Sequence, residues 1–390
     1  MKFFAYIQNI ISDIFIIWRN ELRAVFKDPG VIIFFFVVPL IYPVLYGVIY
    51  NTEIVSEVPV VVIDHSNTSL SREFIRKIDG TADVSVYAYV SDMEEAKNLV
   101  SAKKAYGIIY IPDDFSININ RGEQTTVSLF YDMSAMLYYK AILLTTTEAS
   151  MEMRDVINVS SIDMPMPYEY VSIYNPQGGF ASFLVPAILI LVLQQTLLLG
   201  ISMLAATNKE RNPNHTLIPY KSSYKGVFRI VLGKALTYFS IYIFVSIWAL
   251  VIVPALFNLP QIINYGTLLL FTLPYLLACI FFSMSISVLV KGRETPMMLF
   301  VFLSVPLLFL SGISWPEAAI PSFWKGFSYF FPSTFGIQGF VKMNTMGASL
   351  IDVAFEYQGL WLQTGVYFII TYMVYTYHFK RKEKLKGLKS

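Results

Sequence analysis

The sequence predicts a membrane all-α bundle of six transmembrane helices with an inserted extracytoplasmic α/β domain. Three observations predict this class: the composition, the long runs without charge, and one polar stretch within the chain. Of the 390 residues, 55% are hydrophobic and only 14% are charged, and the mean hydropathy is +0.56. Soluble domains carry about 25% charged residues. We therefore expect most of this chain to lie in lipid.

Six stretches are long and apolar enough to cross a membrane, which takes roughly 20 residues per helix. The longest run without charge, 235–290, contains turn residues at 258–261 that divide it into two spans. We predict that none of the six spans contains Asp, Glu, Lys or Arg. The remaining four spans are expected within 29–51, 171–208, 295–316 and 357–379.

Basic residues alternate along the chain and orient these spans. They precede the first span, lie between the second and third and between the fourth and fifth, and follow the sixth. Because such loops stay in the cytoplasm, we expect a multi-pass protein of the bacterial inner (plasma) membrane. Both termini are then cytoplasmic, and residues 380–390 form a basic cytoplasmic tail.

Residues 1–28 are expected to form a cytoplasmic amphipathic helix. Apolar residues recur there at helical spacing, from Ile7 to Trp18, which favours a helix lying on the membrane surface. The alternative is an ordinary helix packed on protein. No small-residue cleavage site follows, so a cleaved signal peptide is not expected.

Segment 52–175 has an ordinary, acidic composition, with 18 Asp and Glu against 9 Lys and Arg. Strands are predicted at 58–64, 83–90, 106–112 and 125–132. Helices are predicted at 69–78, begun by Ser69, at 91–104, begun by a capping box from Ser91 to Glu94, and at 134–159. Alternation of strands and helices predicts a mixed sheet.

Several classes of function are disfavoured by the residues present. Cys279 is the only cysteine, which excludes a disulfide framework or a cysteine-based metal site. Gly233-Lys234 lacks the spacing of a phosphate-binding loop, so this chain itself is expected to bind no ATP. Asp64 and His65 are expected to form a turn at a strand end. We predict no catalytic residue, no metal, no cofactor and no nucleic-acid partner.

The predicted absence of charge in the spans argues against a carrier driven by protons or sodium. It favours an apolar or amphipathic substrate. Gln194 and Gln195 are the most polar residues in the middle of a span. They are expected to face the cargo pathway or a dimer partner, or to form hydrogen bonds between helices.

Four segments resemble the membrane subunit of ABC-2 (type V) exporters, in the branch with a large periplasmic insert after the first span. Residues 18–29 resemble the interfacial elbow leading into that span. Residues 208–234 resemble the coupling region, although Asn214-His215 stands where the family has Gly-Thr. Residues 310–316 resemble the end of span five, and 320–334 the outer re-entrant segment.

The resemblance implies a permease domain at 176–379 with a cytoplasmic coupling loop at 205–230 and a re-entrant segment at 317–340. It implies that cytosolic ABC ATPase subunits use the ATP, with membrane lipid, a second permease copy or paralogue and a periplasmic adaptor protein as further partners. The implied ATPase-coupling residues are Lys209, Glu210, Arg211, Pro219, Gly233 and Lys234. The implied gate residues are Ser311, Gly312, Pro316, Pro321 and Pro332.

Two other classes of function stay open. One is a membrane-anchored assembly or docking protein with no transport activity, and the other is a membrane-bound enzyme. The basic loop also has a second interpretation, which is contact with anionic lipid headgroups alone. The external segment either docks an adaptor or only seals the exit of the pathway or stabilises a dimer.

Overall fold

The computed structural model describes residues 2–50, 56–131, 136–157, 180–211, 217, 226–259, 261–290, 292–313 and 319–387. The chain divides into two compact units, which are treated separately below. Unit 1 comprises Met1–Asn51 and Ser172–Ser390, and unit 2 comprises Thr52–Val171.

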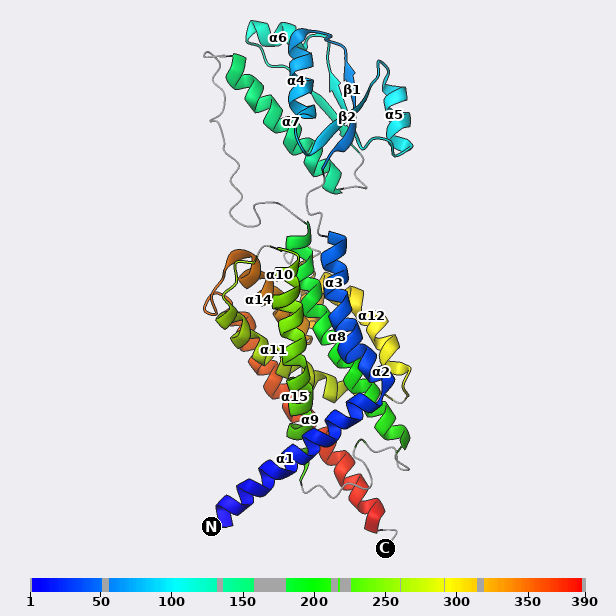
Figure 1. Ribbon diagram of the computed structural model, residues 1–390, viewed down its shortest axis with the longest axis vertical. Coiled ribbons are helices and arrows are strands. Elements are labelled where there is room, and N and C mark those ends of the chain that lie inside the picture. Colours follow the sequence, from blue (N-terminus) through cyan, green and yellow to red (C-terminus); the bar gives the residue numbers. More distant parts are fainter. Residues whose placement is uncertain are drawn as a thin grey trace. The chain divides into compact units, whose positions relative to one another are not determined.

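The regular elements described in unit 1 are all helical (Figure 1). Its N-terminal helices begin where local chemistry favours them: Asp28 caps α2 by accepting a hydrogen bond from the Gly30 amide, and Pro29 occupies the first position. The elements are α1 (Lys2–Lys27), α2 (Pro29–Ile32), η1 (Ile33–Val37), α3 (Val38–Tyr50), α8 (Phe180–Arg211), α9 (Val227–Ile247), η2 (Trp248–Ile252), α10 (Val253–Leu256), α11 (Tyr265–Ile286), α12 (Thr295–Leu310), α13 (Ser322–Ser328), α14 (Pro332–Met346) and α15 (Ala354–Gly387).

Within the described residues, four helical stretches are long and apolar enough to span a membrane. They are Pro29–Ile49, Leu184–Arg211, Val227–Leu256 and Tyr265–Ile286. The fifth predicted span corresponds to α12, which has only 16 residues, and the sixth lies within the 34-residue α15. Neither is among the four, because α12 is short and the whole of α15 is much less apolar than the four spans.

The prediction that no span contains a charged residue is wrong for α8 and α9. The span in α8 ends with Lys209, Glu210 and Arg211, and the span that includes α9 contains Arg229 and Lys234. The charge-free run begins at Ala235, but the helix begins eight residues earlier, at Val227. Acidic residues of α1 pair with Arg229 and Lys234, so α9 continues through both cations.

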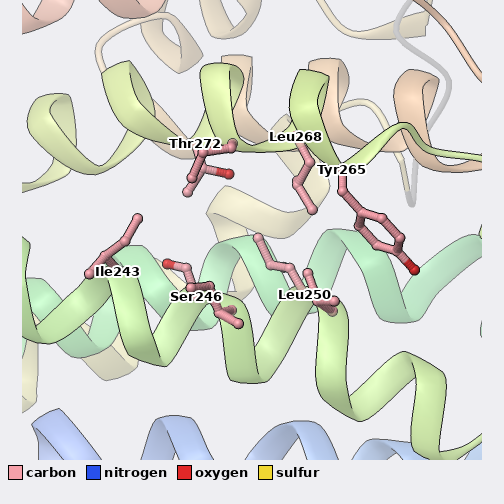
Figure 2. A pocket seen from close by; sticks show the side chains of 9 residues that line it. Ile243, Ser246, Leu250, Tyr265, Leu268 and Thr272 are labelled. Carbon is pink, nitrogen blue, oxygen red and sulfur yellow. The ribbon is translucent and has the colours of Figure 1, made fainter.

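Two π-helical stretches, η1 and η2, interrupt the spans. In η1, Phe35 is fully buried, and a Cβ atom at Gly200 of α8 would lie 2.0 Å from its ring. Position 200 therefore requires glycine for this packing. The second stretch, η2, borders a hollow beside α11 (Figure 2).

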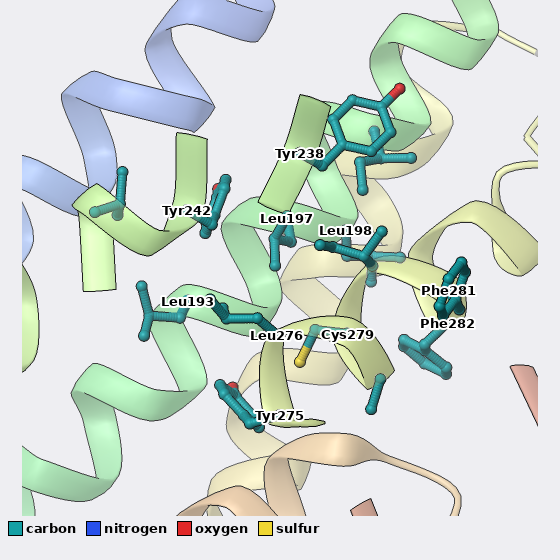
Figure 3. Close-up of a cluster of buried hydrophobic side chains, with 14 of the residues drawn as sticks. Leu193, Leu197, Leu198, Tyr238, Tyr242, Tyr275, Leu276, Cys279, Phe281 and Phe282 are labelled. Atoms are coloured by element: carbon teal, nitrogen blue, oxygen red, sulfur yellow. The ribbon is translucent and has the colours of Figure 1, made fainter. Parts of the chain in front are cut away.

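The core of unit 1 lies between α8, α9 and α11. Large aromatic side chains fill it together with leucines, and Cys279 is fully buried among them (Figure 3). Tyr275 donates a hydrogen bond from its hydroxyl to the Ile190 carbonyl at 2.6 Å, which satisfies its polar end.

Unit 2 contains a four-stranded mixed sheet, as predicted. The strand order is β2-β1-β3-β4, with β1 parallel to β2 and β3, and β4 antiparallel to β3. One apolar core lies on the face covered by α4, α6 and α7, and a smaller one lies under α5 (Figure 1). The elements are β1 (Val58–Asp64), α4 (Ser69–Asp79), β2 (Val84–Tyr89), α5 (Met93–Ser101), β3 (Gly107–Ile111), α6 (Phe115–Arg121), β4 (Ser128–Tyr131) and α7 (Met136–Ile157).

Two predicted caps in unit 2 need correction. Thr68, not Ser69, is the N-cap of α4, and it forms a capping box with Ser71. The N-cap of α5 is Asp92, whose side chain makes no capping hydrogen bond. Asp64 is the last residue of β1, at the start of the predicted turn, and it accepts hydrogen bonds from the Asn67 amide and the Ser71 hydroxyl.

Candidate coupling site

The predicted coupling residue Gly233 lies where α1 crosses α9. A Cβ atom at this position would lie 2.7 Å from Ile17 Cγ2 and 3.1 Å from the Ile14 carbonyl oxygen. Because only glycine leaves this space, the backbones of α1 and α9 approach closely. Part of the predicted apolar stripe of α1 therefore packs on protein, whereas Ile11 and Phe15 remain exposed.

Lys234 extends from α9 into the same contact. Its Nζ donates to Glu21 Oε1 of α1 at 2.6 Å, and the Tyr238 hydroxyl donates to the same oxygen at 2.6 Å. Only 6% of the Lys234 side chain and 10% of the Glu21 side chain are exposed. A buried pair of this kind leaves an uncompensated charge when either partner is removed.

Further polar contacts set the register between α1 and α9. Asp13 pairs with Arg229, the Trp18 Nε1 donates to Ser240 Oγ at 3.1 Å, and the Thr237 hydroxyl donates to the Trp18 carbonyl at 3.2 Å. Asp13 meets Arg229, whereas Trp18 and Glu21 both contact residues between Lys234 and Ser240. The polar contacts of α1 therefore fall within one stretch of α9, from Arg229 to Ser240.

Lys209 anchors the C-terminal end of α8. Its buried Nζ donates to the carbonyl oxygens of Ser287 at 3.2 Å, Val288 at 2.6 Å and Val290 at 2.7 Å. Ser287 is the C-cap of α11, and Val288 and Val290 follow it. The ammonium group therefore ties the end of α8 to the residues that directly follow α11.

Asp28 joins three segments at one carboxylate. It pairs with Arg293 in the turn before α12, accepts a hydrogen bond from the Thr207 hydroxyl of α8 at 2.9 Å, and caps its own helix at Gly30. Asp28 is 4% exposed. We use the term charged end for this region of unit 1, defined by Asp13, Glu21, Asp28, Lys209, Arg229, Lys234 and Arg293.

The structure brings some of the predicted coupling residues together and leaves others apart. Gly233 and Lys234 contact α1, and Lys209 contacts the residues that follow α11, whereas Glu210 and Arg211 are exposed in the last turn of α8. Pro219 lies outside the described residues. Sequence reasoning missed Glu21, Asp28 and Arg293. One feature of the sequence could have indicated this site: Glu21 places a carboxylate about one helical turn beyond Trp18, on the apolar stripe of α1.

The predicted gate residues lie around α12, α13 and α14. Ser311 is buried, and its carbonyl accepts a hydrogen bond from Gln338 of α14 at 3.2 Å, while Gly312 adopts a positive φ of 84°. Pro321 borders an apolar cavity of about 330 Å³ beside Trp324, and Pro332 begins α14. Pro316 lies outside the described residues.

Gln194 contributes a hydrogen bond between helices, one of the two predicted alternatives. Its Oε1 accepts from the Ser333 amide at the start of α14, at 2.5 Å. The neighbouring Gln195 is 1% exposed, and neither its Nε2 nor its Oε1 has a partner among the described residues. We use the term aromatic end for α13, α14 and the residues between them, with Phe323, Trp324, Phe327, Phe330 and Phe331.

A comparison with protein families matches residues 29–373 to a family described as ABC-2 family transporter protein. No curated protein and no solved structure matches significantly. The family match covers most of the chain and confirms the resemblance to ABC-2 permeases. Members of this family are the membrane subunits of ABC transporters, which partner an ABC ATPase subunit and generally have no nucleotide-binding site of their own. The chain therefore belongs to the ABC-2 family of transporters and is an integral membrane permease subunit.

Proposed function

We propose that this permease works as an exporter of an apolar or amphipathic substrate, as a dimer with two cytosolic ATPase subunits. The observation that carries the proposal is the polar bonding at the charged end. Exposed Glu210 and Arg211 directly follow Lys209, which is bonded to carbonyls of the residues that follow α11. A displacement of the segment after α8 is transmitted through Lys209 to α11.

The same end offers a second route of transmission. Segment 212–225 leads into α9, whose first turns are bonded to α1 through Arg229 and Lys234. An ATPase that draws this segment inward displaces α9 and α1 as a pair. In this proposal, ATP binding closes the ATPases, and the charged end carries that movement into the spans.

The proposed topology has six spans, with α12 and α15 as the fifth and sixth. At about 1.5 Å rise per residue, the 34 residues of α15 are more than long enough to cross a bilayer. Both termini are then cytoplasmic and unit 2 is extracytoplasmic. With buried Cys279 replaced, cysteines at exposed Ser91 and Ser12 distinguish the two sides. An impermeant thiol reagent should label Ser91→Cys in intact cells and Ser12→Cys only after permeabilisation.

The second candidate function is docking or assembly without transport, and the separate apolar cores of unit 2 favour it. Purification of the full-length chain from native membranes distinguishes the two functions. An exporter should retain a Walker-motif ATPase, and vesicles holding this complex should hydrolyse ATP faster when the substrate is present. A chain that retains no ATPase, while its loss disturbs an envelope assembly, supports docking instead.

A further inference from the structure

A cavity of about 220 Å³ lies between α9, η2 and α11 (Figure 2). Its walls are mainly apolar, with Ile243, Leu250, Leu268 and Leu269 among them, and Ser246 and Thr272 add hydroxyl groups. None of the described residues that line it is charged. An engineered apolar cavity of about 150 Å³ stays dry and binds benzene, so this cavity has room for a stretch of hydrocarbon.

Ser246 is the polar group that this cavity leaves unsatisfied. The residue is 3% exposed, and its hydroxyl has no hydrogen-bond partner among the described residues. Figure 2 shows that hydroxyl on the side of α9 that faces α11. Ser283 of α11, by contrast, donates to the carbonyl four residues earlier at 2.7 Å. Buried polar groups are nearly always paired, so the Ser246 hydroxyl calls for an acceptor from a ligand.

The cavity is bordered by a π-helical stretch and opens between membrane spans. The π-helix η2 begins at Trp248, two residues after Ser246, and it supplies Leu250 to the wall. Such stretches occur frequently at functional sites. Ile247 and Leu269, which also line the cavity, are 41% and 54% exposed on two candidate spans. In an integral membrane protein, these side chains face lipid, so a ligand enters from the bilayer.

We propose that this cavity binds one ester-linked acyl chain of a membrane phospholipid, whose ester carbonyl oxygen accepts the hydrogen bond of Ser246. The uncharged walls offer no ion pair to a phosphate headgroup, whereas apolar walls with the buried, unpartnered Ser246 hydroxyl match the start of an acyl chain. The site is distinct from the charged end and from the aromatic end. It depends on the chain being a membrane protein and not on the direction of transport.

Photolabelling of the full-length protein in lipid nanodiscs tests this site. The probes are two phosphatidylcholines with a diazirine in the chain, one ester-linked and one ether-linked, and the ether probe lacks the carbonyl. Labelled peptides are counted by mass spectrometry over 243–251 and 265–272. The ester probe should label wild type about three- to tenfold more than the ether probe, which is the range for one hydrogen bond.

Three variants separate the contribution of the Ser246 hydroxyl from that of the cavity itself. Ser246→Ala keeps the cavity and removes the hydroxyl, so both probes should label it equally and weakly. Ser246→Phe fills the cavity and should abolish labelling by both probes. Leu236→Phe places the same ring on an exposed position of α9 that does not line the cavity, and it should label as wild type does.

Equal labelling of wild type by the two probes overturns the proposal, as does undiminished labelling of a folded Ser246→Phe protein. Size-exclusion profiles and melting temperatures establish which variants are folded. Should Ser246→Phe fail to fold, the ester-to-ether ratio in Ser246→Ala decides. A ratio unchanged from wild type then excludes the hydrogen bond.

Discussion

The two ends of unit 1 are held together by different chemistry. At the charged end, α1, α8, α9 and the residues after α11 are joined by formal charges, of which the Glu21–Lys234 pair is the most deeply buried. At the aromatic end, α14 is joined to α8 by the neutral hydrogen bond from Ser333 to Gln194, and Phe327 packs edge to face against Trp324 and Phe331. Buried charge makes the first end costly to separate, whereas the neutral contact between α8 and α14 rearranges at lower cost. The ion pair of α14 joins Lys342 to Glu356 of α15 and does not involve α8.

The largest expected effect comes from breaking the buried pair at the charged end. Lys234→Met removes the cation and leaves the Glu21 carboxylate buried without its charge partner. We expect a loss of about 3–5 kcal/mol of stability, measured by thermal unfolding in detergent. The double variant Glu21→Leu with Lys234→Met should recover most of this loss, and exposed Arg211→Met serves as the control. Equal stability of the single variant and wild type would show that the pair contributes nothing.

A smaller effect is expected from separating the α1 and α9 backbones at the same end. Gly233→Ala places a Cβ atom against Ile17 and the Ile14 carbonyl, so the helices must shift. Overpacking of this kind costs about 1–3 kcal/mol. Gly292→Ala is the matched control, because a Cβ atom there has no neighbour within 4 Å. Identical melting temperatures for the two variants would contradict the close approach.

Gln194 and Gln195 of α8 test how much a neutral hydrogen bond contributes at the aromatic end, because only Gln194 makes one to α14. Gln194→Leu leaves the buried Ser333 amide without its acceptor, which costs about 1–3 kcal/mol. Gln195→Leu removes an amide that has no partner among the described residues, so we expect no loss of stability or a gain. Chemical denaturation of both proteins measures the difference. A larger loss for Gln195→Leu would indicate that position 195 has a partner in the working transporter.

The smallest effect is expected for an ion pair that is largely exposed to solvent. In unit 2, Lys77 donates to Glu152 at 2.9 Å, but the Glu152 side chain is 67% exposed. Lys77→Ala should cost no more than about 1 kcal/mol, and raised salt should remove even that effect. A loss as large as that of Lys234→Met would show that burial is not what separates the two pairs.

Prediction from sequence succeeded where the signal was local. The strand from Val58 to Asp64 was predicted with the correct bounds, because an uninterrupted apolar run precedes turn residues. The short helix Phe115–Arg121 was missed, since its alternating polar residues carry no helical periodicity. The mixed sheet followed from the order of strands and helices.

The charged end was beyond sequence reasoning for a physical reason. Lys234 and Glu21 are 213 positions apart, and no local pattern indicates that they meet. Locating spans by charge-free runs treated Lys234 as the boundary of a helix that in fact begins at Val227. Lys209, Gly233 and Lys234, which make contacts at this end, were singled out from the sequence, but the acidic residues Glu21 and Asp28 were not.

The central claim is that the charged end receives the movement of the ATPase, and co-purification of that ATPase tests it most directly. The full-length permease is expressed with its ATPase, and the amount of ATPase retained per permease is measured. Glu210→Lys reverses an exposed charge beside Lys209, whereas Glu95→Lys makes the same change at an exposed position of unit 2. The account predicts at least a tenfold loss of retained ATPase, about 1.4 kcal/mol, for Glu210→Lys and none for Glu95→Lys. Full retention by Glu210→Lys would contradict it.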